Sequence, residues 1–388
     1  MEEFKSYKLS EVANLSTGFP FDGSKYSKSG IRVVRGDNVT IGSLRWDSEK
    51  LKCWPEPFSR SKEYSLQDGD IVIGMDGSRV GRNRAQISES DLPLLLAQRV
   101  ACIRHNEKSV QDYLYYLIFN ERFVDYVKSV QTGTSIPHIS LKQIGDYEVQ
   151  LPSIERQKSI CRVLKSLDEK IVLNNRINHN LEDFLLSLYG RLLDSQCGSS
   201  TIGQVSERVY SGGTPDTKNS DYWGGTINWL SSGETSNHFI IDTEKRITEN
   251  GVLHSSTKFA SKYDVVIASA GQGNTRGQTS MTLLDTCINQ SVIVIHANTY
   301  EAPIVFCSLA NRYDELRAIS DASSIRGSLT TKMISALEIP VFPEVETFKF
   351  ASQAKCIIDQ VENNLRENRS LTMMRDSLLP KLMRGGLS

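Results

Sequence analysis

The sequence lacks the motifs that usually identify enzymes acting on nucleic acids. It contains no N-P-P-[FY] motif of an adenine methyltransferase and no G-x-x-x-x-G-K-[ST] phosphate-binding loop. Its histidines form no H-E-x-x-H cluster, and no serine or cysteine lies in a recognisable nucleophile motif. The segment GQGNTRG, residues 271–277, is glycine-rich but does not open a cofactor-binding β-α-β unit. We therefore expect a chain without catalytic residues, bound cofactor or metal ligands.

Long apolar runs and paired cysteines are also missing. The most apolar stretch, LPLLLAQRVACI, is interrupted by Gln98 and Arg99 well before membrane-spanning length, and the polar, acidic start MEEFKSYK is unlike a secretory signal. The cysteines are odd in number, 7, and form no C-x-x-C pair, which favours reduced thiols over disulfides or a zinc site. We expect a soluble cytoplasmic protein that does not associate with membranes.

A strong excess of positive charge is absent as well. The net charge is −1 and the pI is about 6.6, so any basic surface for nucleic acid must be local or supplied by a partner. The length of 388 residues is too great for one core and suits two globular units plus connectors.

Two segments show the 3,4 spacing of a coiled-coil seam. The first has seam positions Ile160, Leu164, Leu167, Ile171, Asn174, Asn178, Leu181, Leu185, Leu188 and Leu192. The second lies 190 residues later, at Phe350, Ala354, Ile357, Val361, Asn364, Asn368, Leu371, Arg375, Leu378 and Leu382. Every position of the second seam is apolar or asparagine except Arg375, where Met374 is expected to cover the seam instead. Because both asparagines recur at one offset, the chain is predicted to be an internal duplication.

The segments before each long helix repeat too. DGDIVIGMDG parallels SKYDVVIASAG, and AQRVACI parallels NQSVIVI, each pattern predicting a strand beside a glycine loop. Amphipathic helices are predicted at 110–129, opened by a capping box from Ser109 to Asp112, and at 303–320, opened by Pro303. The predicted fold is α+β, with two similar α/β domains, 1–152 and 195–343, and long helices at 153–194 and 344–388 that form an antiparallel coiled coil with pseudo-two-fold symmetry.

A buried asparagine in such a seam fixes register, because its amide must find a polar partner at the same level. Antiparallel pairing of two symmetric helices places Asn174 opposite Asn368 and Asn178 opposite Asn364. Some 38 residues at 1.5 Å each give a rod of about 57 Å. The helices are therefore interpreted as a spacer without chemistry of their own.

Several motifs resemble those of the specificity subunit of type I restriction-modification systems over essentially the whole chain. They are the helix entry LPSIERQKSICRVLKSLDEKI, the opening SGGTPDTKNSDYWGGTINWLSSGE, the run QTGTSIPHIS and the terminal LLPKLMRGGLS. The first opening, STGFPFDGSKYSKSGIRVVRGD, is a looser version without the Tyr222–Trp223 pair. The resemblance implies that each globule is a target recognition domain for half of a bipartite DNA sequence. It also implies that the helices dock two methyltransferase subunits, which use S-adenosylmethionine, and through them a motor-nuclease subunit.

Candidate DNA contacts lie in loops at equivalent places of the two halves. They are Arg79, Arg82 and Arg84; Gln131, Thr132, Ser135 and His138; Gln272, Asn274 and Arg276; and Ser323, Ser324 and Arg326. The competing interpretation is a solvated charged face and ordinary turn capping. Trp223 and Trp229 could stack on bases, but a core position is the preferred interpretation.

Two other functions compete with DNA recognition. The globules of a structural tether would bind proteins, and such a chain would show no salt-sensitive, sequence-dependent DNA binding. A self-contained nucleic-acid enzyme is disfavoured by the missing motifs, and methylation or nicking by the chain alone would be its mark.

Overall fold

The computed structural model describes all residues except 1–3, 56–59, 134, 272, 323–326 and 384–388. The chain divides into two compact units, each of which contains one globule and part of both long helices. The first unit comprises residues 1–169 and 372–388, and the second comprises residues 170–371. The long helices are α5 (Ile154–Leu192) and α11 (Glu344–Met383). Within the described ranges, no helix is both long enough and apolar enough to cross a bilayer.

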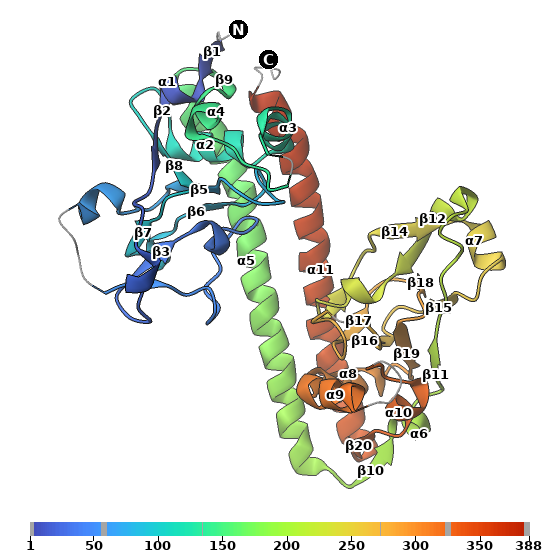
Figure 1. Ribbon diagram of the computed structural model, residues 1–388. Helices are drawn as coiled ribbons and strands as arrows, with labels where there is room; N and C mark the ends of the chain where they lie inside the picture. Colours follow the sequence, from blue (N-terminus) through green and yellow to red (C-terminus); the bar gives the residue numbers. More distant parts are fainter. Residues whose placement is uncertain (1–3, 56–59, 134, 272, 323–326, 384–388) are drawn as a thin grey trace. The chain divides into compact units, whose positions relative to one another are not determined.

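The first unit is built on two small sheets (Figure 1). One is antiparallel, in the order β2 (Ala13–Thr17), β8 (Val100–His105), β5 (Ile71–Gly74), β6 (Arg84–Gln86). The other has the order β4 (Cys53–Trp54), β3 (Ile31–Val34), β7 (Leu94–Leu96), with β3 parallel to β7. The pair β1 (Lys5–Lys8) and β9 (Glu148–Leu151) and the short helices α1 (Leu9–Val12) and α4 (Leu141–Gly145) complete the unit.

The second unit repeats this arrangement with one additional edge strand in each sheet. Its larger sheet has the order β11 (Arg208–Ser211), β19 (Val292–His296), β16 (Val265–Ala268), β17 (Thr279–Thr282), β13 (Phe239–Ile240). Its other sheet has the order β14 (Lys245–Ile247), β12 (Trp223–Leu230), β18 (Thr286–Ile288), β15 (Lys258–Ala260). The remaining elements are the pair β10 (Gly198–Thr201) and β20 (Glu338–Val341) and the helices α6 (Ile202–Val205), α7 (Glu249–Leu253) and α10 (Thr331–Ser335).

The predicted duplication and fold class are confirmed. The strand β5 reads IVIG and its counterpart β16 reads VVIA, and every residue of both is buried because both faces of each strand are covered. β5 pairs with β8 as β16 pairs with β19. Trp229 is 5% exposed and packs edge-to-face on Trp223, which agrees with the core interpretation of these two rings.

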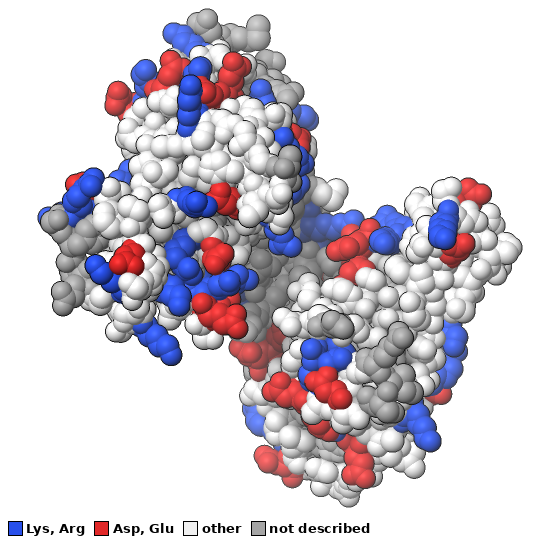
Figure 2. Space-filling view, viewed as in Figure 1, with Lys and Arg blue, Asp and Glu red and all other residues white. Residues whose placement is uncertain are grey.

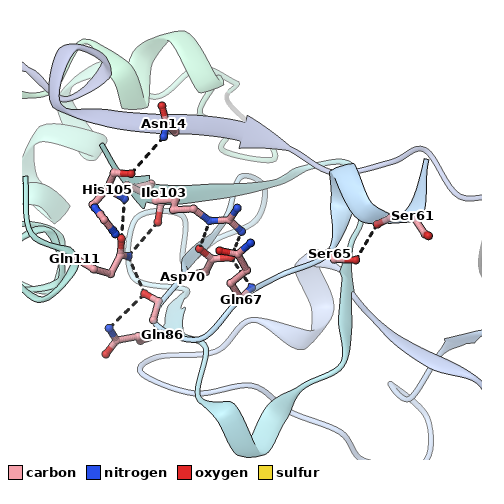
Figure 3. Close-up of polar contacts among 11 residues, drawn as sticks. Asn14, Ser61, Ser65, Gln67, Asp70, Gln86, Ile103, His105 and Gln111 are labelled. Atoms are coloured by element: carbon pink, nitrogen blue, oxygen red, sulfur yellow. Dashed lines mark hydrogen bonds and ion pairs between the residues drawn. The ribbon is translucent and has the colours of Figure 1, made fainter. Parts of the chain in front are cut away.

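A buried aspartate precedes the central strand of each unit and anchors it. Asp70 accepts the backbone N–H of Gln67 and two N–H groups of Arg104, at 2.7 and 2.6 Å (Figure 3). Asp264, at the equivalent position, accepts from Ser261 and lies 2.6 Å from Nδ1 of His296. Burial raises the pKa of Asp264. The same carboxylate is thus satisfied by different partners in the two repeats.

Both amphipathic helices are interrupted, contrary to the prediction of one helix in each place. The first is α2 (Gln111–Ile118) followed by α3 (Glu121–Val130), because Asn120 caps a new helix by accepting from Phe123 N. The second is α8 (Ala302–Ala310) followed by α9 (Tyr313–Asp321). The predicted capping box at Ser109 is also wrong, because its hydroxyl donates to Val12 O, and Val110 is the N-cap residue. Pro303 does lie in the first turn of α8.

The predicted asparagine pairs are present in the second unit. Asn174 Nδ2 donates to Asn368 Oδ1 at 2.9 Å, and Asn364 Nδ2 donates to Asn178 Oδ1 at 2.7 Å. All four side chains are at most 9% exposed. Since the lower-numbered asparagine of α5 pairs with the higher-numbered one of α11, the two helices run antiparallel, as predicted.

The position of Arg375 differs from the expectation. Met374 is 52% exposed and does not cover the seam. Arg375 instead pairs with Asp168 at 2.8 Å, and the other carboxylate oxygen of Asp168 accepts the Tyr116 hydroxyl at 2.7 Å. The exception to the apolar pattern is therefore an ion pair inside the first unit.

Removing one member of an asparagine pair should destabilise the second unit. Asn178→Ala leaves the buried Asn364 amide without its acceptor, which should cost about 1–3 kcal/mol. Asn363→Ala, an exposed neighbour on the same helix, is the matched control and should cost less than about 1 kcal/mol. Urea unfolding followed by circular dichroism measures both variants, and equal losses would contradict the role of the pair.

Candidate nucleic-acid interface

A polar cleft of about 580 Å³ opens in the first unit between three loops. They are the turn after β3 (residues 35–40), the loop after β5 (residues 76–83) and the turn before β8 (residues 97–99). The cleft is lined by four arginines, Arg35, Arg45, Arg79 and Arg99. Figure 2 shows basic side chains gathered on this unit near the place of β3 in Figure 1, with fewer acidic ones among them.

The cleft arginines are held by backbone and acidic neighbours without being buried. Arg35 Nη2 donates to Lys50 O at 3.1 Å, and its guanidinium lies 5.8 Å from the Tyr26 ring centroid. Arg45 forms an ion pair with Asp47 at 3.2 Å. The cleft lining contains two aspartates, Asp37 and Asp76, against four arginines, so it is a local positive surface of the kind that DNA binding would require in a chain of net charge −1.

The structure separates the three arginines predicted for the loop after β5. Arg79 is exposed and lines the cleft. Arg82 forms two hydrogen bonds, 3.1 and 2.7 Å long, with the Glu121 carboxylate.

Arg84, also predicted as a DNA contact, is buried inside the first unit. It is 8% exposed, donates to Gly81 O at 2.7 Å, and lies over the rings of Phe119 and Phe123. Burial lowers its pKa.

The predicted loop 131–138 lies against the cleft loops. The backbones of Thr132 and His138 exchange hydrogen bonds of 2.9 and 2.8 Å, which join the two ends of this loop. His138 Nδ1 lies 2.5 Å from an Asp76 oxygen, and Thr132 and Ser135 are exposed. Gln131 is the C-cap residue of α3 and is partly exposed.

In the second unit, only part of the predicted set can be placed. Asn274 is exposed, and its backbone carbonyl accepts the Tyr313 hydroxyl at 2.8 Å. Arg276 is 8% exposed, because it pairs with Asp321 and donates to Gly327 O at 2.7 Å. These contacts hold the Arg276 guanidinium within the second unit, so the structure gives no support to its predicted DNA contact. Gln272, Ser323, Ser324 and Arg326 lie outside the described residues.

Sequence reasoning missed Arg35, Arg45, Asp76 and Arg99. Arg35 and Arg45 follow a strand but belong to no glycine-rich motif, and Arg99 was noted only as an interruption of an apolar run. Arg99 directly precedes β8, and its counterpart Ser291 directly precedes β19. Comparing the last residue before each repeated strand would have revealed that an arginine in one copy replaces a serine in the other.

Comparisons with known proteins agree in both sequence and fold. Residues 1–183 match the family model described as the type I restriction modification DNA specificity domain. The type I restriction enzyme MjaVIII specificity subunit of Methanocaldococcus jannaschii is 28% identical over 47% of this chain and 43% of its own length. The chain thus spans less than half of that relative. The HindI specificity subunit of Haemophilus influenzae is 20% identical over 99% of this chain and all of its own length. The crystal structure of a type I restriction-modification S subunit from M. genitalium matches 98% of this chain and 96% of its own, with a TM-score of 0.63 and 15% identity.

The burial of Arg84 and the exposure of Arg79 predict opposite phenotypes. Arg84→Gln should lower stability by about 1–3 kcal/mol, because Gly81 O loses its donor. Arg79→Gln should leave stability unchanged and weaken duplex DNA binding. The plot of log affinity against log salt concentration should become less steep by about 0.9, the change expected for the loss of one phosphate contact. Arg122→Gln, at an exposed arginine outside the cleft, is the control for both. A salt slope unchanged in Arg79→Gln would remove Arg79 from the interface.

Proposed function

We propose that this chain, whose residues 1–183 match the type I restriction modification DNA specificity domain, is a DNA-recognition subunit that reads a bipartite target, one half with each unit. The observation that carries the proposal is the repeated architecture: two units that share a core strand order have loops at equivalent positions, and these loops differ in sequence. Two related but diverged readers suit a target whose two halves differ.

The first unit has the chemistry that such a reader needs. Arginine binds phosphate oxygens, and its fork-shaped donors match O6 and N7 of guanine in the major groove. The cleft brings four such side chains together, with Gln98, Asn83 and Thr40 between them as hydrogen-bonding groups. Phosphate contacts orient the duplex, whereas contacts with base edges select the sequence.

We further propose that the chain is not itself an enzyme. Its full sequence contains no methyltransferase or phosphate-loop motif. Two methyltransferase subunits docked on the long helices would supply S-adenosylmethionine and transfer its methyl group to adenine. A motor-nuclease subunit would join through them, and the assembly would act on DNA in the cytoplasm.

The proposal predicts independent readout of two half-sites. Replacing residues 201–338 with the matching domain of a relative should change one half of the methylated sequence and leave the other half intact. Sequencing of methylated adenines in cells that carry the wild-type or the chimaeric chain, with its methyltransferase, measures both halves. Changes in both halves would contradict independent readout.

The long helices should determine the distance between the half-sites. Inserting four helical residues after Glu169 and four after Leu371 keeps α5 and α11 in step and adds about 6 Å, roughly one helical turn. At about 3.4 Å per base pair, the spacer should lengthen by one or two base pairs while both half-sites persist. An active variant with an unchanged spacer would rule out this role of the helices.

A protein tether without DNA contacts remains the alternative function. It predicts that the complex with methyltransferase has no sequence preference and that its DNA binding does not differ from that of methyltransferase alone. A competition assay between target and unrelated duplexes, repeated at several salt concentrations, separates the two functions.

A further inference from the structure

Arg99 adopts a backbone conformation that non-glycine residues rarely occupy. It lies in the turn between β7 and β8 with φ of +66°, in the left-handed region. A residue with a Cβ atom, such as arginine, is strained in this conformation, whereas glycine would adopt it without strain. Strained non-glycine residues concentrate where a side chain must point in one direction for binding.

Three loops meet at this residue and fix it. The Arg99 carbonyl accepts Met75 N at 3.0 Å, and the Met75 carbonyl accepts Ile139 N at 2.9 Å. Gly77 N donates to Pro137 O at 3.0 Å. The loop after β5, the loop 131–139 and the turn before β8 are therefore joined by backbone hydrogen bonds beneath the cleft.

Asp76 orients the Arg99 side chain from within this junction. One Asp76 oxygen accepts from Arg99 Nη1 at 3.3 Å, and the other lies 2.5 Å from His138 Nδ1. The Arg99 side chain nevertheless remains 73% exposed, while that of Asp76 is 27% exposed. Asp76 uses only part of the guanidinium, so the remaining N–H groups can reach a ligand in the cleft.

We propose that Arg99, positioned by Asp76 and His138, reads a guanine in the half-site of the first unit, while the other cleft arginines contact phosphates. The inference rests on the proposed function and adds the base and the residue that selects it. A carboxylate beside the guanidinium disfavours a phosphate there, because the two anions repel each other. It does not disfavour the neutral edge of guanine, whose O6 and N7 accept two parallel hydrogen bonds from arginine.

The second unit has counterparts of two of these three backbone hydrogen bonds but carries different side chains at the equivalent positions. Ser269 N donates to Ser291 O at 2.8 Å, as Met75 N does to Arg99 O, and Leu329 N donates to Ser269 O at 2.8 Å, as Ile139 N does to Met75 O. By this correspondence, Ala270, Ser291 and Ser328 occupy the places of Asp76, Arg99 and His138. The backbone hydrogen bonds are thus common to both units, whereas Arg99 with Asp76 and His138 occurs only in the first unit.

The test is a map of methylated adenines made with the full chain and its methyltransferase, for the wild type and the variants Arg99→Gln, Asp76→Asn and Arg122→Gln. Arg99→Gln should reduce the preference for guanine at one position of one half-site roughly 10- to 100-fold and leave the other half-site unchanged. Asp76→Asn should reduce the same preference less, because Arg99 remains but is no longer held. Arg122→Gln, outside the cleft, should keep the wild-type sequence preference.

Arg99→Gly separates reading from folding. It removes the left-handed strain, so its unfolding temperature should equal or exceed that of the wild type, yet its guanine preference should fall like that of Arg99→Gln. A wild-type base preference at every position in Arg99→Gln would overturn the assignment while leaving the proposed function intact. A wild-type complex that methylates without sequence preference would overturn both.

Discussion

Hydrogen bonding between buried amides sets the register on which the rest of this architecture depends. An apolar seam alone would allow α5 and α11 to slide by a heptad, because leucine packs comparably well at successive levels. The pairs Asn174–Asn368 and Asn178–Asn364 oppose such a shift, since it would break both amide–amide hydrogen bonds. Each compact unit contains segments of both helices, so one register defines which residues of α11 complete each unit.

Among the arginines near the glycine loops, burial separates those that stabilise the fold from those that are exposed and available to a ligand. Arg84 and Arg276 follow glycine loops and look like ligands in the sequence, yet both are 8% exposed and satisfy backbone carbonyls. Arg79 is exposed and the Arg99 side chain is 73% exposed, and the ion pair of Arg99 with Asp76 contributes little stability because its arginine is largely in solvent. An exposed, oriented charge that contributes little to folding is the kind of group that recognition requires.

The elements that could be predicted from the sequence are those governed by periodicity and repetition. The seam asparagines, the central strands and the duplication all follow from spacing along the chain. The helix break at Asn120 was missed because a cap inside an amphipathic stretch interrupts no hydrophobic pattern. Met374 was wrongly placed in the seam, because the competing ion pair of Arg375 needs Asp168, a residue more than 200 positions earlier. The cleft was missed for the same reason: three loops distant in sequence build it, and no local pattern records their meeting.

The first unit is assembled from two segments that lie far apart in the chain, and this affects its folding during synthesis. Its hydrophobic core contains Leu382 and Met383 together with Ile160 and Leu164, so its last core residues emerge from the ribosome roughly 200 residues after the others. At about 5–20 residues per second, this corresponds to a delay of about 10–40 s. During that interval the nascent chain carries an apolar surface that no later segment yet covers, and a chaperone or a partner subunit would have its best opportunity to bind it.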